Sequence, residues 1–207
     1  DHTRIYYTIC DYVGGTVEVQ CAIYYRDQDQ AGNWGVSNRL PDFINQSGYT
    51  NTQPTVGKNR ETGQEYLFFT SDRPGGQGGM DIWCSFLGPD GTFSHPFAVE
   101  AVNSEGDDVT PYWHNRSQTL YLATNGRHNL GGLDIYKSRR EKDGNWAEPK
   151  HLAAPINSSY DDLYYSISSD HKVGYFSSNR PGALCADTAQ DCTVCNDIYQ
   201  YDRLIEI

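Results

Sequence analysis

Two pairs of neighbouring aspartates are the residues best suited to chemistry, because they occupy matching places in the sequence. Asp107-Asp108 and Asp161-Asp162 each precede a short strand-like run. Carboxylate oxygens gathered in this way suit Ca²⁺, and Asp108 with Asp162 would supply the two carboxyl groups of a glycosidase. The competing interpretation, solvated or turn-capping aspartates, is favoured because the matching Tyr49-Thr50 loop has no acidic pair. We therefore predict no cofactor and keep these four aspartates as weak Ca²⁺ candidates.

A second set of aspartates follows glycine-rich turns, once in each of three repeats. An Asp in this position can accept backbone N–H bonds across a tight loop, and an Arg in the same loop can pair with it. Repetition argues against catalysis, since a catalytic group needs to appear only once. The predicted structural loop motif consists of Arg73, Asp81, Asp134, Arg180 and Asp197.

Several classes of function lack their signatures. The six histidines are scattered without metal-ligand spacing, and no GxSxG, Walker or dinucleotide motif is present. The net charge of −11 repels nucleic acid and anionic membrane surfaces. No window reaches the roughly 18 apolar residues of a membrane span, so we expect no transmembrane segment.

The cysteines indicate an oxidising compartment, such as a periplasm or the cell exterior. Cys10 and Cys21 flank the first hairpin loop and form the best predicted disulfide. Cys185 is expected to join Cys195 or Cys192, which leaves Cys84 and one other unassigned. The sequence starts at Asp1 without an initiator Met, which we interpret as a trimmed or excised segment.

The elements that carry these residues repeat along the sequence. An apolar run at 66–70 enters a Gly- and Pro-rich turn, and Asp-Ile-Trp at 81–83 opens the next strand, as in a hairpin. Related hairpins occur at 119–136 and 173–199, and a degenerate copy occurs at 4–25. A spacing of roughly 50–60 residues is typical of propellers and solenoids. A second element runs from an aromatic residue to an Asn over 11, 10 and 11 residues and ends at Asn45, Asn103 and Asn157.

Each full repeat is predicted to hold four antiparallel strands, which in the second repeat are 53–57, 64–71, 81–87 and 96–101. The fold class is therefore all-β, a β-propeller with about four blades, of which the first and last are incomplete. The missing strands are expected in a longer parent protein. The predicted blades are 1–45, 46–103, 104–157 and 158–207.

One face of this propeller gathers the loops with polar residues. Because neighbouring strands run in opposite directions, loops 72–81, 125–134 and 179–197 lie at the same end of the sheets as loops 45–53, 103–109 and 157–163. Ligand contacts are expected there from Arg73, Asp107, Asp108, His128, Asp161, Asp162 and Arg180.

The residues Phe-Thr-Ser-Asp-Arg-Pro-Gly-Gly-Gln-Gly-Gly-Met-Asp-Ile-Trp at 69–83 resemble the PD40 or WD40-like propeller repeat. The spacer from Trp146 to Asn157 is similar to that of envelope proteins of the Bacteroidetes type. In that family the propeller usually lies between tetratricopeptide repeats and an OmpA-like domain, and some members serve type IX secretion. The first repeat departs from the pattern, with Cys10 in place of Asp72 and Ala22 in place of Asp81.

The resemblance implies a non-catalytic binding or scaffold module of a bacterial cell-envelope or exported protein. Its location would be periplasmic, outer-membrane-associated or extracellular, and its partner a protein or a glycan. The alternative is a glycan-cleaving, glycosidase-like enzyme with carboxylates in the central channel, because the turns at 90–93 and 143–146 faintly resemble Asp-box turns. A pair of carboxylates across a concave pocket would favour the enzyme.

Overall fold

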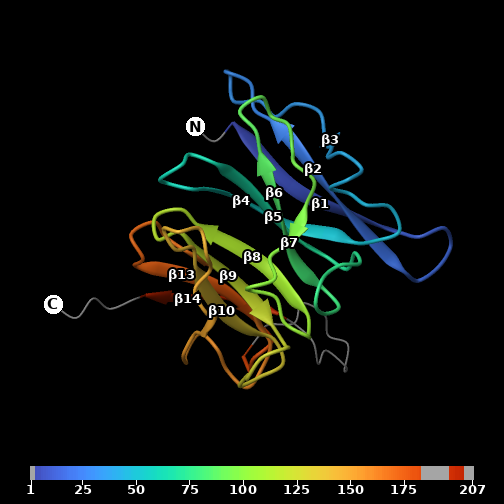
Figure 1. Cartoon of the computed structure of the whole chain (residues 1–207). Helices are drawn as coiled ribbons and strands as arrows, with labels where there is room; N and C mark the ends of the chain where they lie inside the picture. Colours follow the sequence, from blue (N-terminus) through green and yellow to red (C-terminus); the bar gives the residue numbers. More distant parts are fainter. Residues whose placement is uncertain (1–2, 183–195, 203–207) are drawn as a thin grey trace.

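The protein forms fourteen β-strands in four antiparallel sheets (Figure 1), in a computed structural model that describes residues 3–182 and 196–202. These residues include no helix, and the predicted all-β propeller is confirmed. None of the described segments is therefore a helix long and apolar enough to cross a membrane.

Each sheet is one blade, numbered in sequence order. Blade 1 comprises β1 (Arg4–Tyr12), β2 (Val19–Asp27) and β3 (Asn38–Arg39), and blade 2 comprises β4 (Asn51–Lys58), β5 (Glu65–Ser71), β6 (Asp81–Leu87) and β7 (Phe97–Ala98). Blade 3 comprises β8 (Asp108–His114), β9 (Thr119–Thr124), β10 (Asp134–Arg139) and β11 (Lys150–His151), and blade 4 comprises β12 (Asp162–Ile167), β13 (Val173–Ser178) and β14 (Asp197–Asp202).

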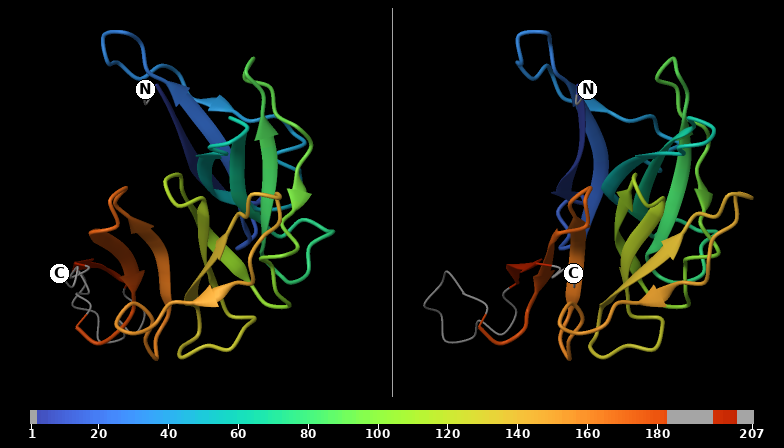
Figure 2. Two further views of the ribbon diagram at one scale, coloured as in Figure 1. Left: turned by 60° about the vertical axis from the view of Figure 1, so that its left-hand side comes forward. Right: turned by 90° about the vertical axis from the view of Figure 1, so that its left-hand side faces the viewer.

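The blades stand side by side around a common axis in an open arc, with blades 1 and 4 at its two ends (Figure 2). Strands β1, β4, β8 and β12 contact one another in succession and are therefore the inner strands. In each sheet the following strands step outward from this axis, as in a propeller.

Strand β5 shows why these sheets need neighbours. Its residues 66–71 are all buried. Leu67 and Phe69 pack in the cluster shared with blade 1, whereas Tyr66 and Phe68 pack in the cluster shared with blade 3. Side chains alternate across a strand, so an unbroken apolar run is stable only when both faces of the sheet are covered.

The hydrophobic core lies between blades, in three clusters that correspond to the three blade contacts. Trp113 of blade 3 packs on Phe68 of blade 2 with ring centroids 5.5 Å apart. Gly57 of β4 permits this approach, because a Cβ there would lie 2.3 Å from the Trp113 ring. Each large buried side chain contributes about 1.5–3 kcal/mol, so the blades stabilise one another.

Candidate functional site

The aspartates that follow the glycine turns hold those turns together. Asp81 is buried and accepts hydrogen bonds from the backbone N–H groups of Gln77 and Gly78, at 3.1 and 3.2 Å. Asp134 is buried in the same way and accepts from Leu130 and Gly131, at 2.6 and 3.2 Å. Asp197 begins β14 at the matching place.

The two loop arginines have different partners from those expected. Arg73 donates to the carbonyls of Phe43 and Ile44 and to the Asn51 side chain, not to Asp81. Arg180 forms its ion pair with Asp162. Both arginines therefore fasten their own loop to the start of the inner strand and to the segment that precedes it. The expected pairing of Arg73 with Asp81 is corrected accordingly.

The paired aspartates are also occupied by the fold. Asp107 accepts the N–H of Met80, and Asp161 accepts the N–H of Leu133, each at 2.9 Å. Asp108 and Asp162 are fully buried and accept hydrogen bonds from Ser104 and Ser158, respectively. The described residues contain no group of three or more acidic, His or Cys side chains placed to hold a metal.

The expected ligand face is therefore smaller than the sequence suggested. Arg73, Asp108 and Asp162 are buried and offer no surface to a ligand, which corrects their assignment. His128 is exposed, whereas Asp107 and Asp161 are half-buried within their loops. Asp108 and Asp162 also cannot form the carboxylate pair that the alternative function required.

Asp108 differs from its counterparts in blades 2 and 4. Burial raises the pKa of the Asp108 carboxyl to about 6, although Thr124, Ser104 and Arg127 act in the opposite direction. The Thr124 side chain lies near the Asp108 carboxyl group, but Asp108 Oδ1 receives no hydrogen bond of good geometry from the described residues. Gly126 stands where blades 2 and 4 have an arginine, so Asp108 lacks the ion pair that stabilises Asp162.

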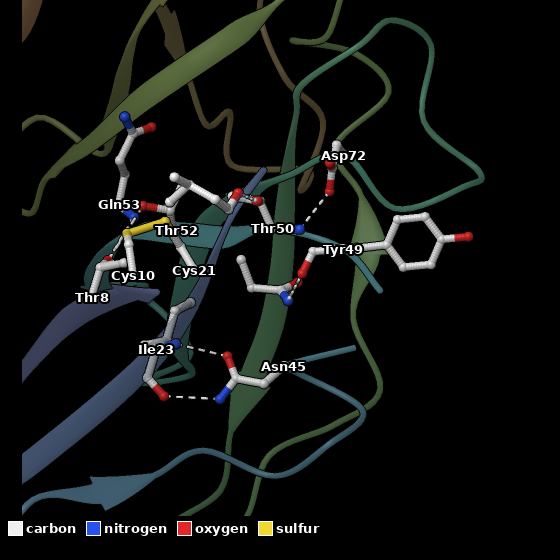
Figure 3. The surroundings of a disulfide bond; sticks show 12 residues. Thr8, Cys10, Cys21, Ile23, Asn45, Tyr49, Thr50, Thr52, Gln53 and Asp72 are labelled. Carbon is white, nitrogen blue, oxygen red and sulfur yellow. Dashed lines mark hydrogen bonds between the residues drawn. A yellow bond between two sulfur atoms is a disulfide. The ribbon is translucent and has the colours of Figure 1, made fainter. Parts of the chain in front are cut away.

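The regular spacer asparagines have a structural role that the sequence did not reveal. Asn45 Oδ1 accepts the Ile23 N–H at 2.7 Å, and its amide donates to the Ile23 carbonyl at 2.9 Å (Figure 3). Asn103 and Asn157 bond Ile82 and Ile135 in the same way. Each Asn thus bonds both backbone groups of an isoleucine on the strand that precedes the short last strand of its blade, and the carbonyl of that isoleucine also accepts the N–H of Leu40, Val99 or Leu152.

A belt of side chains joins the inner strands at the axis. Gln53, Thr110 and Tyr164 occupy the third position of β4, β8 and β12, beside a register shift, with φ of 54°, 52° and 54°. The N–H of each residue donates to a side chain of the preceding blade: Gln53 to Thr8, Thr110 to Gln53, and Tyr164 to Thr110. The belt is polar but has no carboxylate.

The cysteines agree with the sequence where the structure describes them. Cys10 and Cys21 are cross-strand partners in blade 1 and form a disulfide, as predicted (Figure 3). Cys84 is a free thiol in the core between blades 2 and 3, where burial raises its pKa to about 12. Cys185, Cys192 and Cys195 lie outside the described residues.

A cavity of about 1010 Å³ opens between blades 1 and 2, among the a–b and c–d turns opposite the expected ligand face. Here a–b and c–d denote the turns after the first and third strands of a full blade. Polar and apolar groups share the lining of the cavity, and the apolar part includes Val56 and Leu87. Its charged and polar side chains are Thr3, Arg4, Tyr6, Asp27, Lys58, Thr62, Gln64, Glu65 and Asn115. We call this cavity the carboxylate cleft.

Two accessible carboxylates line the carboxylate cleft, one from each blade. Arg4 Nε and Nη2 donate to both oxygens of Asp27, at 2.6 and 3.0 Å, and this contact lowers the Asp27 pKa. Lys58 Nζ lies 3.1 Å from Glu65 Oε1. Asp27 and Glu65 remain about half exposed, with 54% and 46% of their side chains accessible.

Tyr6 gives the cleft a polar group without a partner. Its hydroxyl is buried and makes no hydrogen bond of good geometry with the described residues. Burial raises the pKa of Tyr6, although the nearby Arg4 lowers it. A buried hydroxyl without a partner is unfavourable, so a ligand or water that bonds it gains free energy.

Sequence reasoning missed this cleft because its residues lie in unrelated parts of the repeat. Arg4 and Asp27 are 23 residues apart and become neighbours through β1–β2 pairing. Opposite charges at the two open ends of a predicted hairpin were the available signal. Glu65 joins them only when blade 2 packs on blade 1.

Solved structures with the same fold include enzymes. One described as a glycoside hydrolase aligns over 96% of this chain with a TM-score of 0.57 and 10% identity. Another, described as a BT0996 RGII complex, aligns over 97% with a TM-score of 0.56 and 11% identity. This chain spans 67% and 68% of the two matched proteins, respectively. At such identity the likeness shows the propeller fold alone.

Sequence comparisons give no family assignment. No family model matches the chain, and no curated protein is similar to it. The PD40-like and envelope-protein resemblance therefore has no support beyond the propeller fold. The preference for a non-catalytic scaffold is corrected, because the same fold occurs in a protein described as a glycoside hydrolase and therefore does not favour a scaffold over an enzyme.

Proposed function

We propose that this protein is the propeller part of a glycan-active enzyme that hydrolyses glycosidic bonds. The observation that carries the proposal is the carboxylate cleft, a concave site lined by Asp27 and Glu65 from two adjacent blades. Hydrolysis by most glycosidases needs two carboxyl groups that flank the scissile bond. The likeness of fold to a glycoside hydrolase supports this choice of reaction.

The proposal gives the two carboxyl groups different roles. Arg4 favours the ionised form of Asp27, which suits a nucleophile or the base that takes a proton from water. Glu65 is then the group that protonates the glycosidic oxygen as the bond to the anomeric carbon breaks. Water supplies the hydroxyl of one product and the proton of the other.

The test is release of reducing ends from a panel of neutral and acidic polysaccharides. Asp27→Asn and Glu65→Gln are each expected to lower kcat by about 100-fold or more, the usual size of a lost acid–base contribution. Both ion pairs are exposed, so each variant should stay folded.

Asp42→Asn and Glu148→Gln are the matched controls. Asp42 is also an exposed aspartate paired with an arginine, and Glu148 is exposed, but neither lines the cleft. Their activities should stay within about twofold of the parent protein, since exposed ion pairs have small effects. Absence of hydrolysis across the panel, or full activity in both cleft variants, would overturn the proposal.

We also infer that the protein works outside the cytoplasm, because the Cys10–Cys21 disulfide requires an oxidising compartment to persist. The periplasm, the outer membrane surface and the cell exterior all satisfy this condition. A place among envelope proteins, and a protein partner there, stay predictions of the sequence resemblance. Fractionation of the native cells, with thiol labelling before and after reduction, tests the compartment.

A further inference from the structure

A second cavity lies beside the carboxylate cleft and has a different charge. Its volume is about 390 Å³, and it lies between the a–b turns of blades 2 and 3 and the c–d turn of blade 3. The two cavities are neighbours, because residues next to one another in the sequence line them. Lys58 and Asn115 line the cleft, and Asn59 and Arg116 line the second cavity. Five cations and two carboxylates line it: Arg60, Arg116, Arg139, Arg140, Lys142, Glu61 and Glu141.

This excess of positive charge stands out because the whole protein carries a net charge of −11. The ion pairs found among the described residues include none of the five cations. Cations that outnumber the nearby carboxylates repel one another, and an anion between them reduces that repulsion. The cavity is therefore electrostatically complementary to an anionic group.

Three of the arginines are held in place by uncharged groups. Arg60 Nη1 donates to the Arg116 carbonyl at 3.0 Å, and Arg116 Nη1 donates to the Ser169 carbonyl of blade 4 at 3.2 Å. The Arg140 guanidinium lies 4.9 Å from the Trp146 ring centroid, and its buried Nε has no partner among the described residues. These contacts fix the side chains but leave their charge for a ligand.

We propose that the second cavity binds the carboxylate of an acidic sugar in a glycan strand that continues into the carboxylate cleft. Guanidinium groups bind carboxylates through paired, charge-assisted hydrogen bonds, which gives the site its selectivity for an acidic over a neutral sugar. The adjacency of the two cavities makes a glycan the occupant in preference to an isolated anion. This choice of ligand rests on the proposed function, whereas the anion site rests on the cations alone.

The experiment compares a galacturonic acid oligosaccharide with a galactose oligosaccharide of equal length by isothermal titration calorimetry. Arg139→Gln combined with Lys142→Gln is the test variant, because both side chains are exposed and removal leaves the core intact. Lys137→Gln combined with Lys150→Gln is the control, with the same loss of charge from exposed residues of blade 3 outside the cavity.

The acidic oligosaccharide should bind the parent protein about tenfold more tightly than the neutral one, since charged hydrogen bonds are worth about 1.5–3 kcal/mol. That advantage should disappear in the test variant and remain in the control. Equal binding of the two oligosaccharides, or equal weakening in both double variants, would overturn the proposal. Inorganic phosphate that binds as tightly as the oligosaccharide, with the same sensitivity, would reduce the site to a general anion site and also overturn it.

Failure of the catalytic proposal is distinguishable from failure of this one. Asp27→Asn and Glu65→Gln should remove hydrolysis while the acidic oligosaccharide still gains affinity from the second cavity. Selective binding without hydrolysis would retain the acidic-sugar site and reject the enzyme. Hydrolysis of neutral glycans, without any preference for the acidic oligosaccharide, would retain the enzyme and reject the acidic-sugar site.

Discussion

Asp108, Asp162 and Asn51 occupy the same place at the start of three inner strands, but only Asp162 has an ion pair. Asn51 instead accepts from Arg73, and Asp108 depends on hydroxyl and backbone donors. A buried carboxylate without a cation is unfavourable, which is why burial raises the Asp108 pKa to about 6. Asp108 is therefore a position of the repeat at which a buried carboxylate without a paired cation destabilises the fold.

Asp108→Asn should stabilise the protein at alkaline pH. The folded-state pKa of Asp108 lies above its usual value of 3.8, so the folded state binds this proton more tightly than the unfolded state. The penalty is absent below pH 3.8, grows as pH rises through 6, and is complete above it. Urea unfolding at about pH 8 should show a gain of about 1–3 kcal/mol, and the gain should vanish at about pH 4.

Asp162→Asn is the control for this prediction, because it removes the partner of Arg180. It should lower the free energy of unfolding under the same alkaline conditions. A loss of stability in Asp108→Asn under those conditions would contradict the assignment of Asp108 as an unfavourable buried charge.

Individual residues also show where sequence reasoning reached its limit. The roles of Asp81 and Asp134 in their turns are predictable from the sequence, because their hydrogen-bond donors lie within four residues. Arg73 and Arg180 each bond a serine two residues away, but their other partners lie 18 to 30 residues away and are set by blade geometry, which the neighbouring sequence does not contain. Burial of Asp108 and Asp162 was missed because they adjoin exposed loops in the sequence.

At the scale of elements, the spacer asparagines are part of each sheet. Asn103 completes β6 through both backbone groups of Ile82, next to the short strand β7. The regular spacing of the asparagines is visible in the sequence. Their role is not, because it depends on the position of each amide beside a strand. Strands β5 and β6 were predictable, since they follow the apolar runs and begin or end within one residue of the expected positions. The strand expected at 96–101 is only Phe97–Ala98 (β7), because the Asn103 side chain bonds the Ile82 N–H beyond it.

Asn103→Asp should destabilise the protein by about 2 kcal/mol or more. The substitution replaces the amide that donates to the Ile82 carbonyl with a buried carboxylate that repels it. The measurement is the midpoint and slope of urea unfolding at neutral pH. Gln30→Glu, the same chemical change at an exposed turn residue, should alter stability by less than about 0.5 kcal/mol. Equal effects of the two substitutions would contradict the strand-completing role.

The whole molecule depends on contacts between blades, both apolar and polar. The sequence predicted the apolar contacts, because continuous hydrophobic strands need two covered faces. It did not predict the belt at the axis or the two cavities at the turns, since their residues come from different repeats. Arg139 and Lys142 read individually as surface charges and form a site only with Arg60 and Arg116 of other loops.

Gln53→Ala should weaken the contacts among blades 2, 3 and 4. Its amide accepts from the Thr110 N–H at 2.9 Å and donates to the Tyr164 hydroxyl at 3.1 Å. We expect a loss of about 1–3 kcal/mol and faster hydrogen exchange at the Thr110 amide. Val56→Ala, at an exposed position of the same strand, is the control. Unchanged exchange at Thr110 would show that the belt does not couple the blades.

The belt also has a direction, because every backbone donor in it finds its acceptor on the blade made earlier. The Thr8 side chain is synthesised before the Gln53 N–H that it accepts. In the same way, Gln53 precedes the Thr110 N–H and Thr110 precedes the Tyr164 N–H. Synthesis from the N-terminus therefore presents each new blade with a prepared edge on which to dock. A circular permutant that begins at blade 3 would reverse this order for one junction, and its nascent polypeptide should acquire protease resistance later during translation.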